Sequence, residues 1–441
     1  MTAPKGEPSG AWRVLYPLRD FFHTEAAGGV VLVAATAAAL VWANAAPSSY
    51  DDLWSTVFSI GTDDHSLSLT LRAWVNDGLM AIFFFVVGLE IKRELVEGEL
   101  RQPRQAALPV IAAIGGMVVP ALVYVTFNAG GPGSDGWGIP MATDIAMAIG
   151  VLSLLGNRVP SALKLFVLAL AIVDDIGAIL VIALFYSDDF NAGAALAAGG
   201  FLAAMLVLRA MGVRRLWPFV VLGVGVWVAI HEGGVHATIA GVVLGLLTPT
   251  RPFRQADMVD ADVLTDLSTV ERAHETEVHA RESVSLVEWL EHRIHPWSSY
   301  VIIPTFALAN AGVVISRDSL DAAVSSPITH GIVVGLVVGK LVGISLFTWI
   351  ACRIGIASMP RDARMAHIIG VAALAGIGFT VSLFIAELAF GANGLYTDEA
   401  KLGILAASII AGALGCTLLL RLPARDEPTR AAAEKVTDGS S

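Results

Sequence analysis

Charged residues are scarce in this chain of 441 residues. Asp, Glu, Lys and Arg make up only 15% of the sequence and 55% is hydrophobic, whereas soluble domains are about 25% charged. This balance excludes an ordinary soluble protein. Only two cysteines occur, Cys352 and Cys416. Because both lie in or beside apolar segments, we expect them to pack as small apolar groups and not to form a disulfide.

Apolar segments recur along the chain, and most are about 18 to 25 residues long, the length that a helix needs to cross a bilayer. The sequence predicts twelve of them, at 26–46, 73–90, 105–127, 138–156, 161–186, 192–208, 216–231, 235–249, 297–316, 327–351, 365–390 and 398–420. We therefore predict an all-α polytopic membrane protein with a transmembrane domain at 26–421. An N-terminal arm (1–25), one long, partly helical loop (about 250–296) and a polar, disordered tail (422–441) complete the predicted organisation.

Basic residues are almost missing from one side of the predicted topology. All but four of the 28 Lys and Arg residues fall on the other side or its helix ends, and the exceptions are Arg72, Arg317, Lys340 and Lys401. The positive-inside rule then predicts that both termini are cytoplasmic. The net charge of −11 says little about partners, since acidic residues hardly count in this rule.

Few charges lie inside the predicted membrane segments, and these few indicate the function. Away from the segment ends, they are Asp144, the adjacent pair Asp174 and Asp175, and Lys340. A carboxylate at the centre of a membrane helix costs roughly 2.5 to 3.5 kcal/mol on insertion scales, so such residues usually serve ions or protons. Neighbouring helical residues point about 100° apart. We therefore predict that one carboxylate of the pair faces a neighbouring helix, where the buried Lys340 can neutralise it, and that the other faces a water-filled cavity.

Glycine and proline interrupt two of the predicted segments. Gly138 and Pro140 begin the fourth, and Gly370, Gly376 and Gly378 lie in the eleventh. On the predicted topology, segments three to five and ten to twelve form two three-helix units of opposite orientation. Matched, interrupted helices in inverted repeats indicate an ion site near the middle of the membrane.

Several long motifs resemble one known family. They are WVNDGLMAIFFFVVGLEIKREL, RQAALPVIAAIGGMVVPAL, GWGIPMATDIAMAIGVLSLLGNRVP, LALAIVDDIGAILVIALFY, GVHATIAGVVLG, LEHRIHPW and GIGFTVSLFIAELAF. These stretches resemble the NhaA-type Na⁺/H⁺ antiporters from about residue 22 to residue 421. The resemblance implies twelve helices, with the fourth and eleventh unwound where they cross, an architecture for which this family is a known example.

The resemblance also implies roles for individual residues. It places transported-ion binding, including the Na⁺ ligands, on Asp174 and Asp175, and it adds Thr143, Asp144 and Lys340 to that site. With Lys340 as the implied partner lysine, we expect Asp174 to be the carboxylate that pairs with it and Asp175 to be the principal cation ligand. A pH-sensing cluster is implied at Glu90, Arg93, Glu94, Glu291, His292 and His295, and His236 matches a histidine that affects pH dependence in the family. The resemblance further implies a homodimer, formed through an extracellular hairpin within 47–71.

These observations predict a transporter and not an enzyme. We expect electrogenic, pH-regulated export of Na⁺ or Li⁺ in exchange for H⁺, by alternating access, in the inner membrane of a prokaryote. No cofactor and no nucleic-acid partner is expected. The alternative is a Na⁺-coupled symporter of a small organic solute, which needs more polar groups than the core offers. An intramembrane aspartyl protease needs its two aspartates on separate helices, whereas Asp174 and Asp175 are adjacent.

Overall fold

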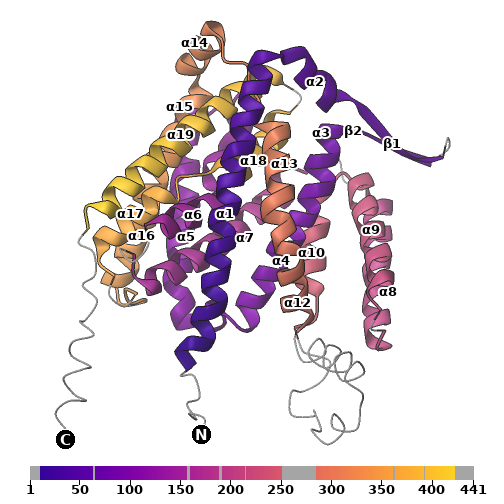
Figure 1. The fold of residues 1–441 in the computed structure, drawn as a ribbon, viewed down its shortest axis with the longest axis horizontal. Coiled ribbons are helices and arrows are strands. Elements are labelled where there is room, and N and C mark those ends of the chain that lie inside the picture. Colours follow the sequence, from indigo (N-terminus) through magenta and orange to yellow (C-terminus); the bar gives the residue numbers. More distant parts are fainter. Residues whose placement is uncertain are drawn as a thin grey trace, which may run out of the picture.

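The fold is a bundle of helices that run side by side (Figure 1). The computed structural model describes residues 10–62, 65–155, 159–187, 191–213, 215–250, 285–360, 363–391 and 393–422. The N-terminal end of the first described helix and the C-terminal end of the last one lie toward the same end of the bundle, which we call the terminal end (Figure 1). A two-stranded hairpin marks the opposite end, which we call the hairpin end.

Each predicted membrane segment is helical in the structure. The first five coincide with α1 (Gly10–Ala45), η1 (Trp74–Leu79) with α4 (Met80–Val96), α5 (Pro103–Asn128), η3 (Ser134–Met141) with α6 (Ile145–Leu154), and α7 (Ser161–Phe185). The other seven coincide with α8 (Ala192–Ala210), α9 (Leu216–Glu232), α10 (Thr238–Leu247), α12 (Leu286–Trp297) with η6 (Ser298–Ile302) and α13 (Ile303–Asn310), α15 (Pro327–Val334) with η7 (Gly335–Gly339) and α16 (Lys340–Arg353), α17 (Met365–Leu374) with α18 (Phe379–Phe390), and α19 (Gly394–Leu420). The predicted all-helical fold is confirmed.

Length and apolar composition separate these helices into two groups. Within the described residues, seven helices are long and apolar enough to cross a membrane, or eight when the bent pair α17 and α18 counts as one span. The remaining segments are shorter or interrupted. In the described part of the chain, four short helices join the long ones: α2 (Pro47–Ser55), α3 (Leu71–Ala73), η2 (Glu99–Arg101) and α14 (Arg317–Ser325).

The predicted boundaries differ from the structure around the ninth segment. Its helix ends at Asn310, and α12 begins at Leu286, inside the predicted loop. Ser285 starts this helix, because its hydroxyl accepts a hydrogen bond from the Glu288 amide at 3.1 Å. Val287 and Leu290 then pack beside Leu89 of α4. The rest of the predicted loop and nearly all of the predicted tail lie outside the described residues, and α1 begins within the predicted N-terminal arm.

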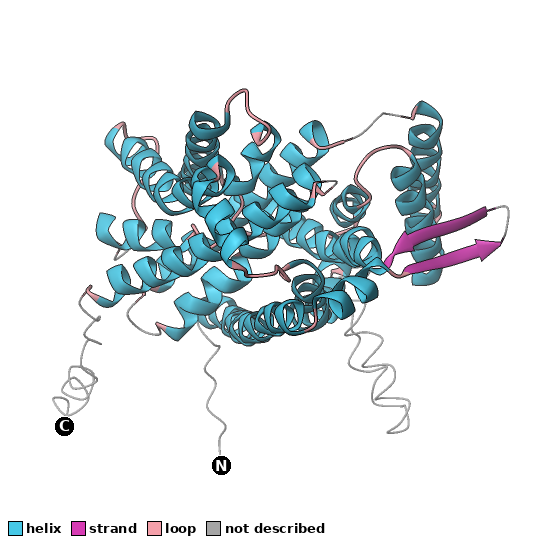
Figure 2. Cartoon of the chain, turned by 90° about the horizontal axis from the view of Figure 1, so that it is seen from above, coloured by secondary structure: helices cyan, strands magenta, loops and turns pink. Residues whose placement is uncertain are grey.

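The hairpin predicted within 47–71 is present. Strands β1 (Val57–Thr62) and β2 (His65–Thr70) pair antiparallel, with Val57 opposite Thr70. Figure 2 shows that the hairpin projects away from the helical bundle. The side chains of Val57, Phe58 and Ile60 are more than half exposed, so the hairpin carries an apolar surface that the described chain leaves uncovered.

Small residues bring α5 and α16 together beside the charged centre. Gly115 faces the backbone of Gly343 so closely that a side chain at either position would collide with the other helix. Just before this contact, the Lys340 amide donates to the Gly335 carbonyl, five residues back. This π-helical turn widens the helix immediately before Lys340, a distortion that is frequent at functional sites.

Candidate functional site

An ion pair at the centre of the bundle joins α7 to α16. Lys340 Nζ lies 2.7 Å from Asp174 Oδ2, and the two side chains are 0% and 1% exposed. The other oxygen, Asp174 Oδ1, is buried and has no hydrogen-bond partner among the described residues. The structure therefore brings together the two residues predicted to pair. A charge pair this deeply buried is costly unless further ligands or protons satisfy it.

Asp175 follows on the next position of α7 but has a different environment. Its side chain is also buried, yet within the described residues its carboxylate makes no hydrogen bond and no ion pair. The charged groups nearest to it include Asp174, Asp144, Glu90 and Lys340. Three of these four neighbours are acidic, so this carboxylate has a strong electrostatic preference for a cation or a proton.

The two interrupted helices cross beside this pair, and Asp144 holds the crossing. Its Oδ1 accepts from the Met147 amide at 3.0 Å and so caps α6. Its Oδ2 accepts from both the amide and the hydroxyl of Thr380, at 3.0 and 2.6 Å, in the first turn of α18. One carboxylate thus meets the positive N-terminal ends of two half-helices. The Asp144 amide also donates to the Ile377 carbonyl at 2.7 Å, so the broken segments contact each other directly.

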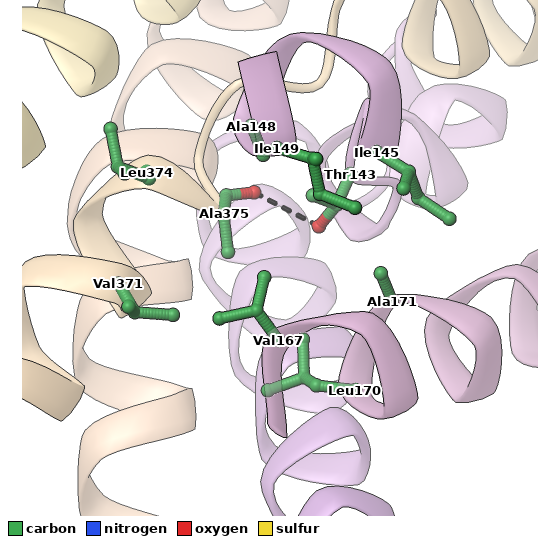
Figure 3. A pocket seen from close by; sticks show the side chains of 10 residues that line it. All are labelled: Thr143, Ile145, Ala148, Ile149, Val167, Leu170, Ala171, Val371, Leu374 and Ala375. Atoms are coloured by element: carbon green, nitrogen blue, oxygen red, sulfur yellow. Dashed lines mark hydrogen bonds between the residues drawn. The ribbon is translucent and has the colours of Figure 1, made fainter. Parts of the chain in front are cut away.

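Thr143 lies on the other side of the same crossing. Its hydroxyl donates to the Ala375 carbonyl at 2.9 Å, and it lies beside the carboxylate of Asp174. Figure 3 shows this bond at the edge of a cavity of about 10 Å³, whose other lining residues are all apolar. A cavity of this size holds one water at most. The Thr143 hydroxyl, with the Ala375 carbonyl that it contacts, thus places uncharged oxygen atoms close to Asp174.

A second group of charges joins α4 to α12 at the terminal end. We call Glu90, Arg93, Glu94, Glu291 and His295 the α4–α12 cluster. Arg93 Nη1 lies 2.7 Å from Glu291 Oε1 and Arg93 Nη2 lies 3.8 Å from Glu94 Oε1. His295 Nε2 lies 3.7 Å from Glu90 Oε1. Burial raises the pKa of the Glu291 carboxyl above its ordinary value, and the neighbouring Arg93 offsets part of that rise.

Two of the predicted pH-sensing residues lie apart from this cluster. His292 is exposed on α12, and within the described residues it makes no ion pair. His236 lies near the hairpin end, between α9 and α10, where its buried Nε2 has no hydrogen-bond partner among the described residues. His236 lines a pocket with Asp77 of η1, which precedes α4, whereas the α4–α12 cluster lies near the C-terminal end of α4.

Thr380, which makes two of the contacts to Asp144, was not predicted from the sequence. The sequence nevertheless contains a pattern that could have revealed it. Thr380 lies just after the GIG stretch that interrupts the eleventh segment, as Thr143 lies at the interruption of the fourth segment. Asn76 and Asn310 were missed as well. Their buried side-chain amides donate to each other, at 3.3 and 2.7 Å, and join η1 to α13. Such pairs between distant segments leave no local pattern in a sequence.

Comparison with known proteins identifies the family. The model of the family described as Na⁺/H⁺ antiporter 1 matches residues 19–419. The chain belongs to this family. A Na⁺/H⁺ antiporter NhaA of Oleidesulfovibrio alaskensis is 45% identical, over 97% of this chain and 99% of the relative. One of Rhodopirellula baltica is 46% identical, over 96% and 97%, and one of an Anaeromyxobacter species is 47% identical, over 93% and 92%.

Membership in the Na⁺/H⁺ antiporter family fits the fold described above. The family match covers every helix from α4 to α18 and both interrupted segments, and the relatives are named as transporters, not as enzymes. The chain is therefore a multi-pass membrane protein. The charged centre formed by Asp144, Asp174, Asp175 and Lys340 lies inside the matched region.

Proposed function

We propose that this protein exports Na⁺ or Li⁺ in exchange for H⁺, and that Asp174 and Asp175 bind both ions in turn. The observation that carries the proposal is the unpaired, buried carboxylate of Asp175 beside the Asp174–Lys340 ion pair. Sodium is a hard cation that prefers oxygen ligands. Carboxylates, the Thr143 hydroxyl and the carbonyls of the unwound segments supply them, and the same carboxylates bind protons when the cation has left.

Competition at one site produces exchange. A buried carboxylate binds a cation or a proton, because either one neutralises a charge that is expensive in a low-dielectric environment. If the site changes its exposure from one membrane face to the other only when it is occupied, one ion leaves as the other enters. The crossing of α6 and α18 at Asp144 is the contact most directly coupled to such a change, since it joins both interrupted segments.

The Asp174–Lys340 pair supports electrogenic exchange. Binding of Na⁺ between both aspartates requires Asp174 to release Lys340, and departure of Na⁺ allows the pair to form again. More than one titrating group therefore changes state in each cycle, and their protonation is coupled. Each net charge moved gains about 2.3 kcal/mol per 100 mV of membrane potential. A Na⁺ concentration jump on a solid-supported membrane is expected to give a transient current, and its absence would contradict this part of the proposal.

We further propose an orientation and a location for the protein. With the terminal end in the cytoplasm, the basic residues lie inside, as the positive-inside rule requires, and the protein lies in the inner membrane of a prokaryote. The α4–α12 cluster then senses cytoplasmic pH, because Glu291 and His295 tie one helix to another through contacts that depend on their protonation.

A homodimer completes the proposal. The exposed apolar side chains of the hairpin fit a second copy of the same hairpin, since a projecting two-stranded ribbon is only marginally stable by itself in water. Deletion of residues 57–70 is expected to convert a dimer into a monomer in detergent, as measured by native mass spectrometry. An unchanged mass would assign the hairpin another role.

Substitution of Asp175 by Asn tests the proposed exchange. Asp175→Asn keeps the size of the side chain but removes the charge that competes for cation and proton, so we expect Na⁺-dependent proton movement in proteoliposomes to fall by roughly two orders of magnitude, equal to about 2.7 kcal/mol. Asp321→Asn, at an exposed carboxylate of α14, is the matched control and should leave exchange unchanged. Near-normal exchange by Asp175→Asn would overturn the assignment, and dependence of flux on an added organic solute would favour a symporter.

A further inference from the structure

A polar pocket opens at the hairpin end, away from the central aspartates. Its volume is about 320 Å³, and it lies between η1, α18 and the segment that joins α9 to α10. A water molecule takes up about 30 Å³ in the liquid, so this space is ample for a cation with its hydration shell. The charged or titratable residues that line it are Arg72, Asp77, His231, His236 and Glu387.

Glu387 is the lining residue whose charge is least satisfied. Within the described residues no side chain forms a hydrogen bond or an ion pair with its carboxylate. Asp77, the other acid, lies 4.0 Å from His231 Nδ1. Among the described residues, the pocket therefore presents the carboxylate of Glu387 and the Nε2 of His236 without a partner. Its second carboxylate, that of Asp77, lies near His231.

The position of Glu387 on α18 connects this pocket with the centre of the molecule. Thr380, whose amide and hydroxyl hold Asp144, precedes Glu387 by seven residues on the same helix. Seven residues are two helical turns, so both side chains lie on one face of α18, about 10 Å apart along its axis. Glu387 thus stands two turns outward from the crossing.

Nearby basic residues do not remove the charge of this carboxylate. Arg72 lines the same pocket but lies 3.7 Å from Asp51. Lys401 of α19 is buried, yet it forms no ion pair with Glu387 in the described part of the chain. Both positive and negative charges therefore surround Glu387. A carboxylate in such surroundings attracts a cation without binding it irreversibly.

We propose that this pocket is an outer binding site for the transported cation, and that Glu387 is the residue that attracts the cation from the hairpin end. The inference rests on the proposed Na⁺/H⁺ exchange and adds a residue to it. Glu387 then acts on the cation only when the cation approaches or leaves through the hairpin end. A residue that merely holds α18 against α19 would affect both faces of the membrane alike.

Sidedness makes the test selective. Right-side-out vesicles present external Na⁺ to the hairpin end, and everted vesicles present it to the terminal end. The half-maximal Na⁺ concentration for Na⁺-driven proton movement is measured in both. We expect Glu387→Gln to raise it roughly three- to tenfold in right-side-out vesicles, since a partly exposed charge is strongly screened, and to leave it unchanged in everted vesicles.

Three further variants keep the inference falsifiable. Glu387→Asp retains the charge and should behave nearly as the unaltered protein, whereas Asp77→Asn removes the second carboxylate and should shift the same face. Asp321→Asn removes an exposed carboxylate outside the pocket and should shift neither. An equal shift on both faces, or none at the hairpin end, would overturn the outer site while leaving the proposed exchange intact. Absence of exchange by the unaltered protein in both preparations would instead refute the proposed function.

Discussion

Two groups of charges in this protein differ chiefly in burial. At the centre, the side chains of Asp174 and Lys340 are at most 1% exposed. In the α4–α12 cluster, Arg93 remains 31% exposed although it lies as close to its carboxylate partner. Water can replace a lost partner in the second case but not in the first. We therefore propose that the buried Asp174–Lys340 pair, which we call the dry pair, takes part in the transport cycle itself. We propose that the more exposed α4–α12 cluster adjusts the rate of that cycle.

The largest effect is expected when one member of the dry pair is removed. Lys340→Ala leaves Asp174 buried without its partner, and we expect a loss of about 3 to 5 kcal/mol in the free energy of unfolding. Asp174→Asn should cost a similar amount, because it leaves the lysine unpaired. The double variant should recover part of the loss, since neither charge remains. Thermal melts in detergent measure all three, and strictly additive losses would show that the two residues do not interact.

A smaller effect is expected at the crossing of the interrupted helices. Thr380→Val removes the hydroxyl that donates to Asp144 at 2.6 Å, and a hydrogen bond to a charged group is worth about 1.5 to 3 kcal/mol. Ser382→Ala is the matched control, because its hydroxyl lies two residues further along α18 and donates at 2.8 Å to the neutral carbonyl of Ile139. We expect about 0.5 to 1.5 kcal/mol there.

The comparison of these two variants sharpens the role of Asp144. If the carboxylate is charged and holds both half-helices, Thr380→Val must destabilise the protein more than Ser382→Ala, and it must also slow exchange. Equal losses of stability, with exchange unchanged in both variants, would mean that Asp144 is neutral at the crossing. Melting curves and proteoliposome flux on the same preparations distinguish the two outcomes.

Residue types near the membrane centre were enough to predict part of this site. Asp174, Asp175 and Lys340 are charges that a membrane helix does not carry without a reason, so a buried pair of one aspartate with Lys340 was expected from cost, and the resemblance implied that Asp174 is that aspartate. Glycine and proline likewise marked the interrupted helices. These predictions succeeded because each rests on a penalty that a residue carries wherever its helix lies in the bilayer.

The remaining contacts depend on how the helices are rotated against one another. Thr380 and Asp144 are 236 positions apart, and Asn76 and Asn310 are 234 apart. Threonine and asparagine carry no charge, so neither attracted a prediction. Glu387 was not predicted for a related reason. It lies near the end of its predicted segment, close to the hairpin end, where an acidic residue does not stand out because it can reach water. The start of α12 inside the predicted loop depended on a serine cap and on packing against α4.

The smallest effect is expected in the α4–α12 cluster, and its sign follows from the raised pKa of Glu291. A carboxyl whose pKa is higher in the folded protein than in the unfolded chain binds more protons when folded. The free energy of unfolding therefore falls as pH rises from the ordinary pKa of a glutamate through the raised value, by about 1.4 kcal/mol for each pH unit of that window. Above the window the stability no longer depends on this group.

Glu291→Gln mimics the protonated carboxyl at every pH and makes this prediction testable. The variant should lose the fall in melting temperature across the window, while below the window it should melt with the unaltered protein. Its exchange rate should also become less dependent on pH there, because the Arg93–Glu291 contact at 2.7 Å no longer changes with protonation. His292→Gln, at an exposed position outside the cluster, is the control. If both variants keep the pH profile of the unaltered protein, the cluster joins α4 to α12 but does not sense pH.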